Sequence, residues 1–451
     1  THWRQKNGST DQGPLFLTPL IEACNFTEAK TRSNVTLFKS AGVNANAHSG
    51  YITVNKTANS NLFFLFIEAE DNPSSAPLML WTQGGPGRPA LFGLLLQNGP
   101  VKFEMPRNLT KRELTIQKNV SVIYLDVPVG AGFSFTNDTS AYSKSLDDIT
   151  KDILEFLRQF LLLFPGYQGR RFIAAGDSYA ARYSVALAKQ MLECPSPDVN
   201  LTFEGIIGGV GFLAPILYLA DSSDFLFQAS MLDANGYRTF RNQFEKMRNL
   251  TAMRNSSYYP LVIGMLARTI STSKPKTLFQ NLTLYNSQAS ALYTERPLSM
   301  LSCFAYANSS GFKQAIHVGK DTCLQFANPH LLSRLSMDFL IDIHQTVEYV
   351  LNQTRVLFYT GQLDTRFPSP KLQTYFETLN WTHAHTYRIV SRRTWKPYDT
   401  YYGAAAYLRS AVNFTSAVVL GMGHYAAFDK PLEVHHLMMQ FINRNIAFSP
   451  K

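Results

Sequence analysis

The sequence predicts an α/β fold, with a mainly parallel central sheet that carries helices on both faces. Short apolar runs that suit buried strands alternate with longer segments in which apolar residues recur every three or four positions. The alternation is absent from residues 212–310, which hold amphipathic helical pieces and polar stretches. We therefore expect a core built from residues 1–211 and 311–451, with residues 212–310 inserted as a helical cap.

The first part of the chain predicts four strands and a long helix. The strands are expected at residues 51–54, 61–68, 78–81 and 120–125. Ser145 and Asp148 resemble a helix-capping box. From there to Phe164, leucine, isoleucine and phenylalanine recur on one helical face until a proline–glycine pair ends the pattern. This spacing predicts a helix over residues 145–164.

The remaining elements lie on either side of the predicted cap and within it. Before the cap we expect a strand at 172–175, a helix at 179–192 and a strand at 203–211. Helical pieces of the cap are expected at 222–232 and 237–247, and the later core elements at 356–359, 369–379 and 416–420. A final helix is expected to start after Asp429 as its cap, with Pro431 in its first turn, and to run to Ile446.

The composition is that of a globular protein, because 45% of the residues are hydrophobic and only 16% are charged. No apolar run approaches the roughly 18 residues that cross a bilayer, so we expect no membrane span. The net charge of +10 is spread without a compact basic block, which argues against a nucleic-acid partner. The chain opens with a polar stretch at Thr1, and we expect that a signal peptide has been removed.

Glycosylation sequons indicate the secretory pathway. Fifteen Asn-X-Ser/Thr sites occur, at Asn7, Asn25, Asn34, Asn55, Asn108, Asn119, Asn137, Asn200, Asn249, Asn255, Asn281, Asn308, Asn352, Asn380 and Asn413. This density is typical of a protein that carries N-linked glycans and is secreted or lysosomal. The four cysteines fit an oxidising compartment and leave three complete pairings open.

A serine between small residues marks the junction of the strand at 172–175 and the helix that follows. Gly176 and Ala180 lie two positions before and after Ser178. A sharp strand-to-helix turn needs small residues there, because larger side chains would collide with neighbouring backbone. Such a turn lifts the hydroxyl above the sheet, so Ser178 is the candidate nucleophile.

An acid and a histidine follow two later strands in the same manner. Asp364 comes after the strand at 356–359, and His424 comes after the strand at 416–420. Open α/β sheets place their chemistry at the carboxyl ends of strands, and serine–aspartate–histidine is the chain order of α/β-hydrolases. In such a triad His424 takes the proton of Ser178, and Asp364 holds the imidazole in the required tautomer.

No metal or other cofactor is predicted. The remaining histidines that we considered show no metal-ligand spacing with acidic partners, namely His317, His383, His385, His435 and His436. We interpret them as surface or packing residues.

Five motifs together resemble the serine carboxypeptidases, the family that includes carboxypeptidase Y, cathepsin A and the vitellogenic carboxypeptidase-like proteins. The motifs are at residues 81–87, 126–134, 176–180, 361–364 and 423–424. The resemblance extends from about Leu15 to the C-terminal helix. Segments such as Leu15-Phe16-Leu17-Thr18-Pro19 are similar to the vitellogenic-like branch.

This resemblance implies an α/β-hydrolase core without a metal, a helical insertion over the active site, and removal of the last residue from peptide or protein C-termini. It implies that the backbone N–H groups of Gly85 and Tyr179 form an oxyanion hole. It also implies that Gln83, Gln97 and Asp177 bind the terminal carboxylate of the substrate.

The chain departs from the family at the carboxylate-binding positions, because the family has glutamate where this chain has Asp177 and Gln97. Two acids can bind a carboxylate only while they are protonated, whereas an amide donates a hydrogen bond at any pH. We therefore expect activity that extends towards neutral pH.

Arg88 is a second departure, since the family has a stretch of small residues led by cysteine or glycine there. Arg88 either supplies a cation to a terminal carboxylate or fills space and points to solvent, and the second role is the more common one for arginine. The missing loop cysteine implies that Cys323 lacks its family partner. A pairing of Cys323 with Cys303 is one option that remains.

Three functions fit these observations. The first is a carboxypeptidase that acts through an acyl-enzyme on Ser178, and the intact triad favours it. The second is a catalytically weakened or inactive family member that serves as a secreted binding or storage protein, and the altered carboxylate-binding positions favour it. The third is acyl transfer to an acceptor other than water.

Overall fold

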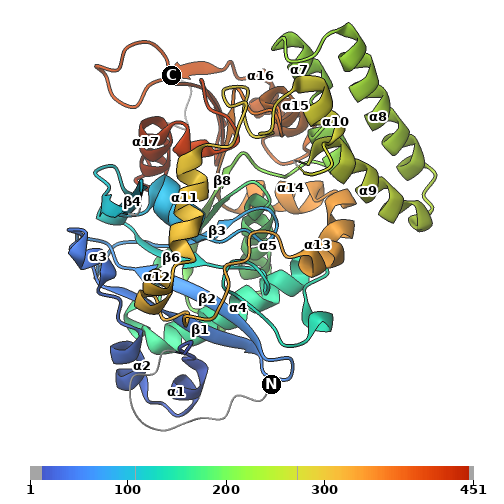
Figure 1. Ribbon diagram of the computed structural model, residues 1–451. Coiled ribbons are helices and arrows are strands. Elements are labelled where there is room, and N and C mark those ends of the chain that lie inside the picture. The colour runs from blue at the N-terminus through green and yellow to red at the C-terminus, as the bar shows by residue number, and fades with distance from the viewer. Residues whose placement is uncertain (1–12, 107, 272, 446–451) are drawn as a thin grey trace.

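The computed structural model describes residues 13–106, 108–271 and 273–445, so the sequon at Asn7 and the predicted helix end at Ile446 lie outside the described residues. A ten-stranded sheet forms the centre, in the order β1-β2-β6-β3-β7-β8-β9-β12-β11-β10 (Figure 1). The six strands from β6 to β12 are parallel, and antiparallel strands extend the sheet at both edges. The predicted α/β-hydrolase class is confirmed.

The strands expected from the sequence are all present. In chain order they are β1 (Ala47–Asn55), β2 (Ser60–Ile67), β3 (Leu78–Gln83), β6 (Ser121–Leu125), β7 (Arg171–Asp177), β8 (Thr202–Gly209), β9 (Arg355–Gly361) and β12 (Phe414–Val419). Sequence analysis missed β10 (Arg393–Trp395) and β11 (Ala406–Ala411), as well as the small separate sheet of β4 (Val101–Glu104) and β5 (Asn108–Lys111). These strands are short and only partly buried, so they lack a continuous apolar run.

Both faces of the sheet are buried, because side chains alternate between them along each strand. Phe172 and Ala174 of β7 contribute to one apolar core, together with the inner faces of α4 (Leu146–Leu163) and α5 (Ala180–Glu193). Their neighbour Ile173 points into the second core, which α17 (Pro431–Ile442) covers. Buried strands with helices on both sides explain the continuous apolar runs in the sequence.

The helix bounds agree with the predicted amphipathic segments within a few residues. Before the sheet lie α1 (Thr18–Glu22), α2 (Phe26–Ser33) and α3 (Leu37–Ser40), and between β9 and β12 lie α15 (Ser369–Thr378) and α16 (Ala384–Ile389). The Ser145 hydroxyl accepts a hydrogen bond from the Asp148 N–H at 3.2 Å, which confirms the predicted cap of α4. The predicted cap of the last helix is wrong. The Asp429 carboxylate accepts instead from the Gly423 N–H, and α17 starts at Pro431.

A long helical segment connects β8 to β9. It comprises α6 (Ile216–Leu219), α7 (Ser223–Gln228), α8 (Ala234–Ala252), α9 (Tyr259–Ile270), α10 (Leu278–Thr283), α11 (Leu298–Ala307), α12 (Ser310–Ala315), α13 (Pro329–Leu335) and α14 (His344–Gln353). Helices α7, α8 and α9 form a group that projects beyond the sheet (Figure 1, green). Helix α14 packs on α5. No helix within the described ranges combines the length and apolar composition that a membrane span requires.

The four cysteines all lie in the described ranges, and each is a free thiol. Cys303 is buried in α11, where burial raises the pKa of its thiol to about 12, whereas Cys323 is exposed. The option of a Cys303–Cys323 pairing is therefore wrong for this structure.

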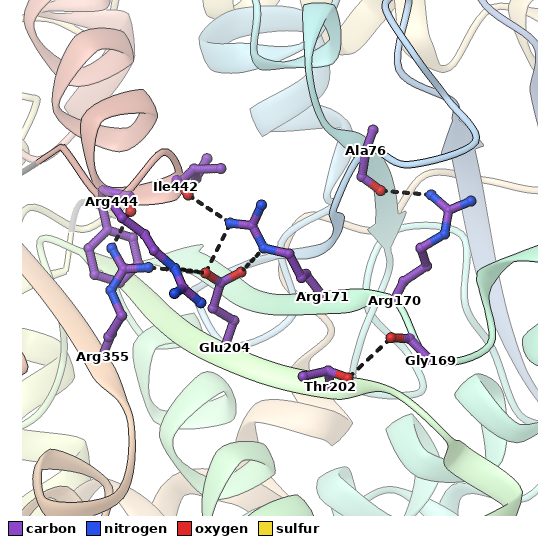
Figure 2. Close-up of polar contacts among 10 residues, drawn as sticks. Ala76, Gly169, Arg170, Arg171, Thr202, Glu204, Arg355, Ile442 and Arg444 are labelled. Carbon is purple, nitrogen blue, oxygen red and sulfur yellow. Dashed lines mark hydrogen bonds and ion pairs between the residues drawn. The ribbon is translucent and has the colours of Figure 1, made fainter.

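A buried glutamate joins three strands and the C-terminal region at the amino ends of the strands. Glu204 of β8 is 7% exposed and accepts hydrogen bonds from Arg171, Arg355 and Arg444 (Figure 2). Arg171 also donates to the carbonyl of Ile442 at 2.9 Å. Burial opposes ionisation of Glu204, but the hydrogen bonds from the arginines outweigh it and lower the pKa of its carboxyl. This cluster holds the C-terminal end of α17 against the amino ends of the strands. Ser178 lies at the other end of the sheet, where the parallel strands end.

Candidate active site

Ser178 occupies the tight turn between β7 and α5. Its backbone φ is +63°, in the left-handed region that residues other than glycine rarely adopt. Two backbone hydrogen bonds hold the turn: the Ser178 N–H donates to Gly209, and the Phe212 N–H donates to the Ser178 carbonyl. A Cβ on Gly176 would lie 2.6 Å from the side chain of Ala180, so the predicted need for small flanking residues is confirmed.

His424 reaches Ser178 from the loop after β12. Its Nε2 lies 3.1 Å from the Ser178 Oγ, and its Nδ1 lies 2.8 Å from Oδ2 of Asp364. The edge of the His424 ring packs against Phe367, with the ring centres 5.2 Å apart. The structure thus brings the three predicted triad residues into one hydrogen-bonded line. This is possible because β7, β9 and β12 are parallel and end at the same edge of the sheet.

Asp364 is fully buried behind the histidine. Its Oδ1 accepts hydrogen bonds from the backbone N–H groups of Arg366 at 2.8 Å and Phe367 at 2.9 Å. These bonds fix the carboxylate so that Oδ2 faces His424. A carboxylate in this position favours the imidazole tautomer with its proton on Nδ1, which leaves Nε2 free to accept the proton of Ser178.

The segment 287–291, from the long connection between β8 and β9, lies across the Asp364 and His424 loops. The carbonyl of Ala289 accepts the backbone N–H of His424 at 2.7 Å, and the carbonyl of Gln288 accepts the Thr365 hydroxyl at 2.7 Å. Backbone contacts of this kind fix loop position without depending on side-chain identity. The inserted region therefore contributes directly to the geometry of the site.

The glycine loop after β3 packs directly on the serine turn. A Cβ on Gly84 would lie 2.6 Å from the Tyr179 backbone nitrogen and 2.7 Å from the Ser178 Cβ, so only glycine fits. Gly85 has a φ of +141° and lines the same pocket as Ser178. In the described part of the chain, neither the Gly85 N–H nor the Tyr179 N–H donates to another group. Both N–H groups are thus without a protein acceptor in that part of the chain.

Asp177 lines the pocket beside Ser178, and Gln97 lies behind it. The Gln97 side-chain nitrogen donates to Asp177 Oδ2 at 2.7 Å and to the Tyr425 carbonyl at 3.1 Å, so both of its N–H bonds are occupied. Tyr359 donates its hydroxyl to Asp177 Oδ1 at 2.8 Å. Burial raises the pKa of the Asp177 carboxyl, although these hydrogen bonds oppose the shift. Gln83 also lines the pocket.

Gln97 does not line the pocket in this structure. The amide of Gln97 was expected to bind a carboxylate itself, but it lies outside the pocket lining and already donates twice. Gln97 instead holds Asp177, which leaves Asp177 and Gln83 as the predicted carboxylate-binding residues that the pocket exposes.

The pocket in front of Ser178 encloses about 720 Å³, including its open mouth. One wall is apolar and consists of Phe92, Met300, Phe304 and Tyr425. The polar lining includes three arginines, Arg88, Arg296 and Arg366. Arg88 is half-buried, so its side chain lies at the pocket and is not simply directed into solvent.

Behind the serine turn, a buried ion pair joins α5 to the long connection. Arg182 and Asp338 are almost fully buried and lie 3.0 Å apart, and the Tyr179 hydroxyl also donates to Asp338. The Arg182 guanidinium lies over the ring of Phe212 at 4.9 Å. Tyr179, the residue that follows the nucleophile, is therefore held in place through its side chain.

Comparison with known proteins agrees with this geometry. The profile of the serine carboxypeptidases, peptidase family S10, matches residues 38–444. The chain belongs to the serine carboxypeptidase family. It is 32% identical to the human probable serine carboxypeptidase CPVL over 95% of this chain and 89% of the human protein. It is 30% identical to the venom serine carboxypeptidase of Apis mellifera, over 95% of this chain and 90% of the bee protein.

Two further comparisons extend the relationship. The vitellogenic carboxypeptidase of Aedes aegypti is 27% identical, over 96% of this chain and 90% of the mosquito protein. Among solved structures, the prohormone-processing carboxypeptidase Kex1(delta)p of Saccharomyces cerevisiae superposes with a TM-score of 0.77 and 17% identity. The alignment covers 94% of this chain and 98% of the yeast chain, and it shows a common fold. The chain is thus a serine-type carboxypeptidase of the hydrolase class, as the resemblance implied.

Sequence analysis missed several residues of this serine carboxypeptidase pocket. Arg296, Met300 and Phe304 come from the long connection, and Arg366 lies two residues after Asp364. None belongs to a motif with a recognisable spacing. The only sequence signal was the unusual Arg88, and its two possible roles could not be separated without the pocket.

Proposed function

We propose that the protein releases C-terminal residues from peptides through an acyl-enzyme on Ser178. The hydrogen-bonded line of Ser178, His424 and Asp364 is the observation that carries this proposal. The Ser178 oxygen attacks the carbonyl carbon of the last peptide bond as His424 takes its proton. His424 then gives that proton to the leaving amine, and the C-terminal residue departs. Water, activated by His424, hydrolyses the acyl-serine and restores the hydroxyl.

Negative charge develops on the carbonyl oxygen during both attacks. The backbone N–H groups of Gly85 and Tyr179 are the donors that we assign to it, because neither has a protein acceptor within the described ranges, Gly85 lines the pocket and Tyr179 directly follows Ser178. Each such donor typically contributes about 10²–10³ in kcat. The same donors distinguish an active enzyme from a storage protein, which would need neither them nor the hydrogen-bonded triad.

Asp177 and Gln83 are the groups that we assign to the terminal carboxylate. A protonated Asp177 donates a hydrogen bond to that carboxylate, whereas an ionised Asp177 repels it. Because burial raises the pKa of Asp177, the protonated form persists to a higher pH than it would in an exposed aspartate. This effect replaces the amide of Gln97 as the reason to expect carboxylate binding above strongly acidic pH.

The experiment compares an N-blocked dipeptide with its C-terminal methyl ester and its C-terminal amide from about pH 4 to 8. For the free acid, kcat/KM is expected to fall as the pH rises through the raised pKa of Asp177, and the amide is expected to react at least about tenfold more slowly. The methyl ester has no terminal carboxylate and reports the triad alone. Asp177→Asn is expected to remove the fall for the free acid, because its amide donates throughout this range.

Gln97 makes the Asp177→Asn variant structurally mild. An asparagine at position 177 can keep its oxygen on the Gln97 amide nitrogen and turn its own nitrogen towards the Tyr359 hydroxyl, whose oxygen can accept. An unchanged pH profile in the variant would contradict the role of Asp177. Transfer of the acyl group to an added alcohol in preference to water would favour acyl transfer over hydrolysis.

The secretory pathway is the proposed route of the protein. Of the fourteen sequons within the described ranges, thirteen have an exposed asparagine, and only Asn413 is half-buried. Exposure is what attachment of a glycan requires. Protein expressed in a secreting animal cell is expected to lose mass in several steps on digestion with an N-glycosidase. A single unmodified mass before digestion would contradict this route.

A further inference from the structure

Three guanidinium groups converge on the pocket that holds Ser178. Arg88 follows the glycine loop, Arg366 follows Asp364, and Arg296 belongs to the connection between β8 and β9. Segments that are far apart in the sequence therefore place three positive charges around one cavity. No ion pair links any of the three to a carboxylate in the part of the chain that the structure describes.

The surroundings of these arginines confirm an excess of positive charge. Burial, followed by the charges of Arg366 and Arg296, lowers the pKa of Arg88 to about 10. Burial also lowers the pKa of Arg366, although Asp364 opposes the shift. The Arg366 Nε is buried and has no hydrogen-bond partner among the described residues, while one of its terminal nitrogens donates to Gln288 at 3.1 Å. A buried unsatisfied guanidinium donor is costly unless a ligand meets it.

The nearby acids form their hydrogen bonds with groups other than the guanidinium groups of these arginines. Asp364 is bound to His424 and to backbone N–H groups, and Asp177 accepts from Gln97 and Tyr359. A single terminal carboxylate has two oxygens and would already meet Asp177 and Gln83. It leaves guanidinium donors at the pocket without a protein acceptor among the described residues, the buried Arg366 Nε among them, because each arginine offers five N–H groups. A second carboxylate on the ligand would supply the missing acceptors.

We propose that the pocket selects peptides whose C-terminal residue is acidic, glutamate or aspartate, an inference that rests on the proposed carboxypeptidase function. The selectivity belongs to the last residue because the arginines share one pocket with Gln83 and Asp177, the groups assigned to the terminal carboxylate. The apolar wall of Phe92, Met300 and Phe304 suits the methylene groups that carry the second carboxylate. Guanidinium groups bind carboxylates with paired, charge-assisted hydrogen bonds.

Hydrolysis of three blocked dipeptides tests this selectivity: one each that ends in glutamate, glutamine or leucine after the same blocked phenylalanine. Glutamine has the size and shape of glutamate without its charge, so the ratio of their kcat/KM values isolates the charge effect. The ratio of glutamate to glutamine is expected to be about tenfold to a hundredfold, as charge-assisted hydrogen bonds to a carboxylate would give. Arg88→Gln and Arg296→Gln are each expected to lower this ratio severalfold, while Arg88→Lys keeps part of it.

Lys246→Gln is the matched control, because it removes the same net charge from the exposed side of α8, away from the pocket. It is expected to leave the ratio unchanged. Equal rates for glutamate and glutamine, or a preference for an acid only at the penultimate position, would overturn the proposal. Cleavage of the leucine peptide in that case would leave the carboxypeptidase function intact.

If none of the three peptides is cleaved, a binding measurement still tests the acidic pocket separately from the proposed carboxypeptidase reaction. Calorimetry with Ser178→Ala measures the affinity for the intact glutamate and glutamine peptides without any turnover. Tighter binding of the glutamate peptide by about tenfold or more would support the acidic pocket even though the proposed reaction had failed. Equal affinities would overturn the acidic pocket on their own.

Discussion

Ser178→Ala is expected to lower kcat for a blocked dipeptide by about 10⁶-fold, because alanine has no oxygen that can form the acyl-enzyme. KM should change little, since the pocket lining and the backbone donors of Gly85 and Tyr179 remain. A fluorophosphonate probe is expected to label the wild-type protein at Ser178 and to leave the variant unlabelled. Turnover is measured with the free-acid dipeptide at the pH optimum of the wild type.

Ser230→Ala provides the matched control. Ser230 also has a positive φ, +57°, but it lies between α7 and α8, away from the pocket, so its replacement tests the loss of a serine from a left-handed turn. We expect its labelling and turnover to equal those of the wild type. Labelling that persists in Ser178→Ala would contradict the assignment of the nucleophile. Labelling of the wild type without any turnover would favour the binding or storage function.

Asp364→Asn is expected to lower kcat by about 10⁴-fold while the protein stays folded. The asparagine oxygen can keep the bonds from the Arg366 and Phe367 N–H groups, so its amide nitrogen then faces His424 Nδ1. Nδ1 must accept that hydrogen bond, which moves the imidazole proton to Nε2. The nitrogen that faces Ser178 at 3.1 Å then carries a proton and cannot take another.

Single-turnover kinetics on a blocked dipeptide measure this loss, and the thermal unfolding midpoint shows whether the variant is folded. The expected pattern is a large change in kcat with little change in KM, because Asp364 lies behind His424 and outside the pocket lining. A folded variant that keeps kcat within about tenfold of the wild type would exclude the proposed role of Asp364 in setting the tautomer.

Much of the fold followed from local sequence patterns. A buried parallel strand must be apolar on both faces, so runs such as Leu78–Gln83 were visible without any tertiary information. The same holds for α4, whose capping serine and apolar face lie within one continuous segment. Strand β10 was missed because it is a short, largely exposed edge strand, and β11, the strand beside it, was missed because it alternates buried with half-buried residues and has no continuous apolar run.

The sequence by itself determined which three residues could form a triad, because Ser178, Asp364 and His424 each follow a strand and parallel strands end at one edge. Only the tertiary structure decided what surrounds them. It placed the Gln97 amide on Asp177, and it brought Arg296 and Arg366 to the pocket beside Arg88. The physical reason is range: strand and turn preferences act between neighbours in the chain. The pocket is made by packing of the β8–β9 connection against distant loops, which no local pattern specifies.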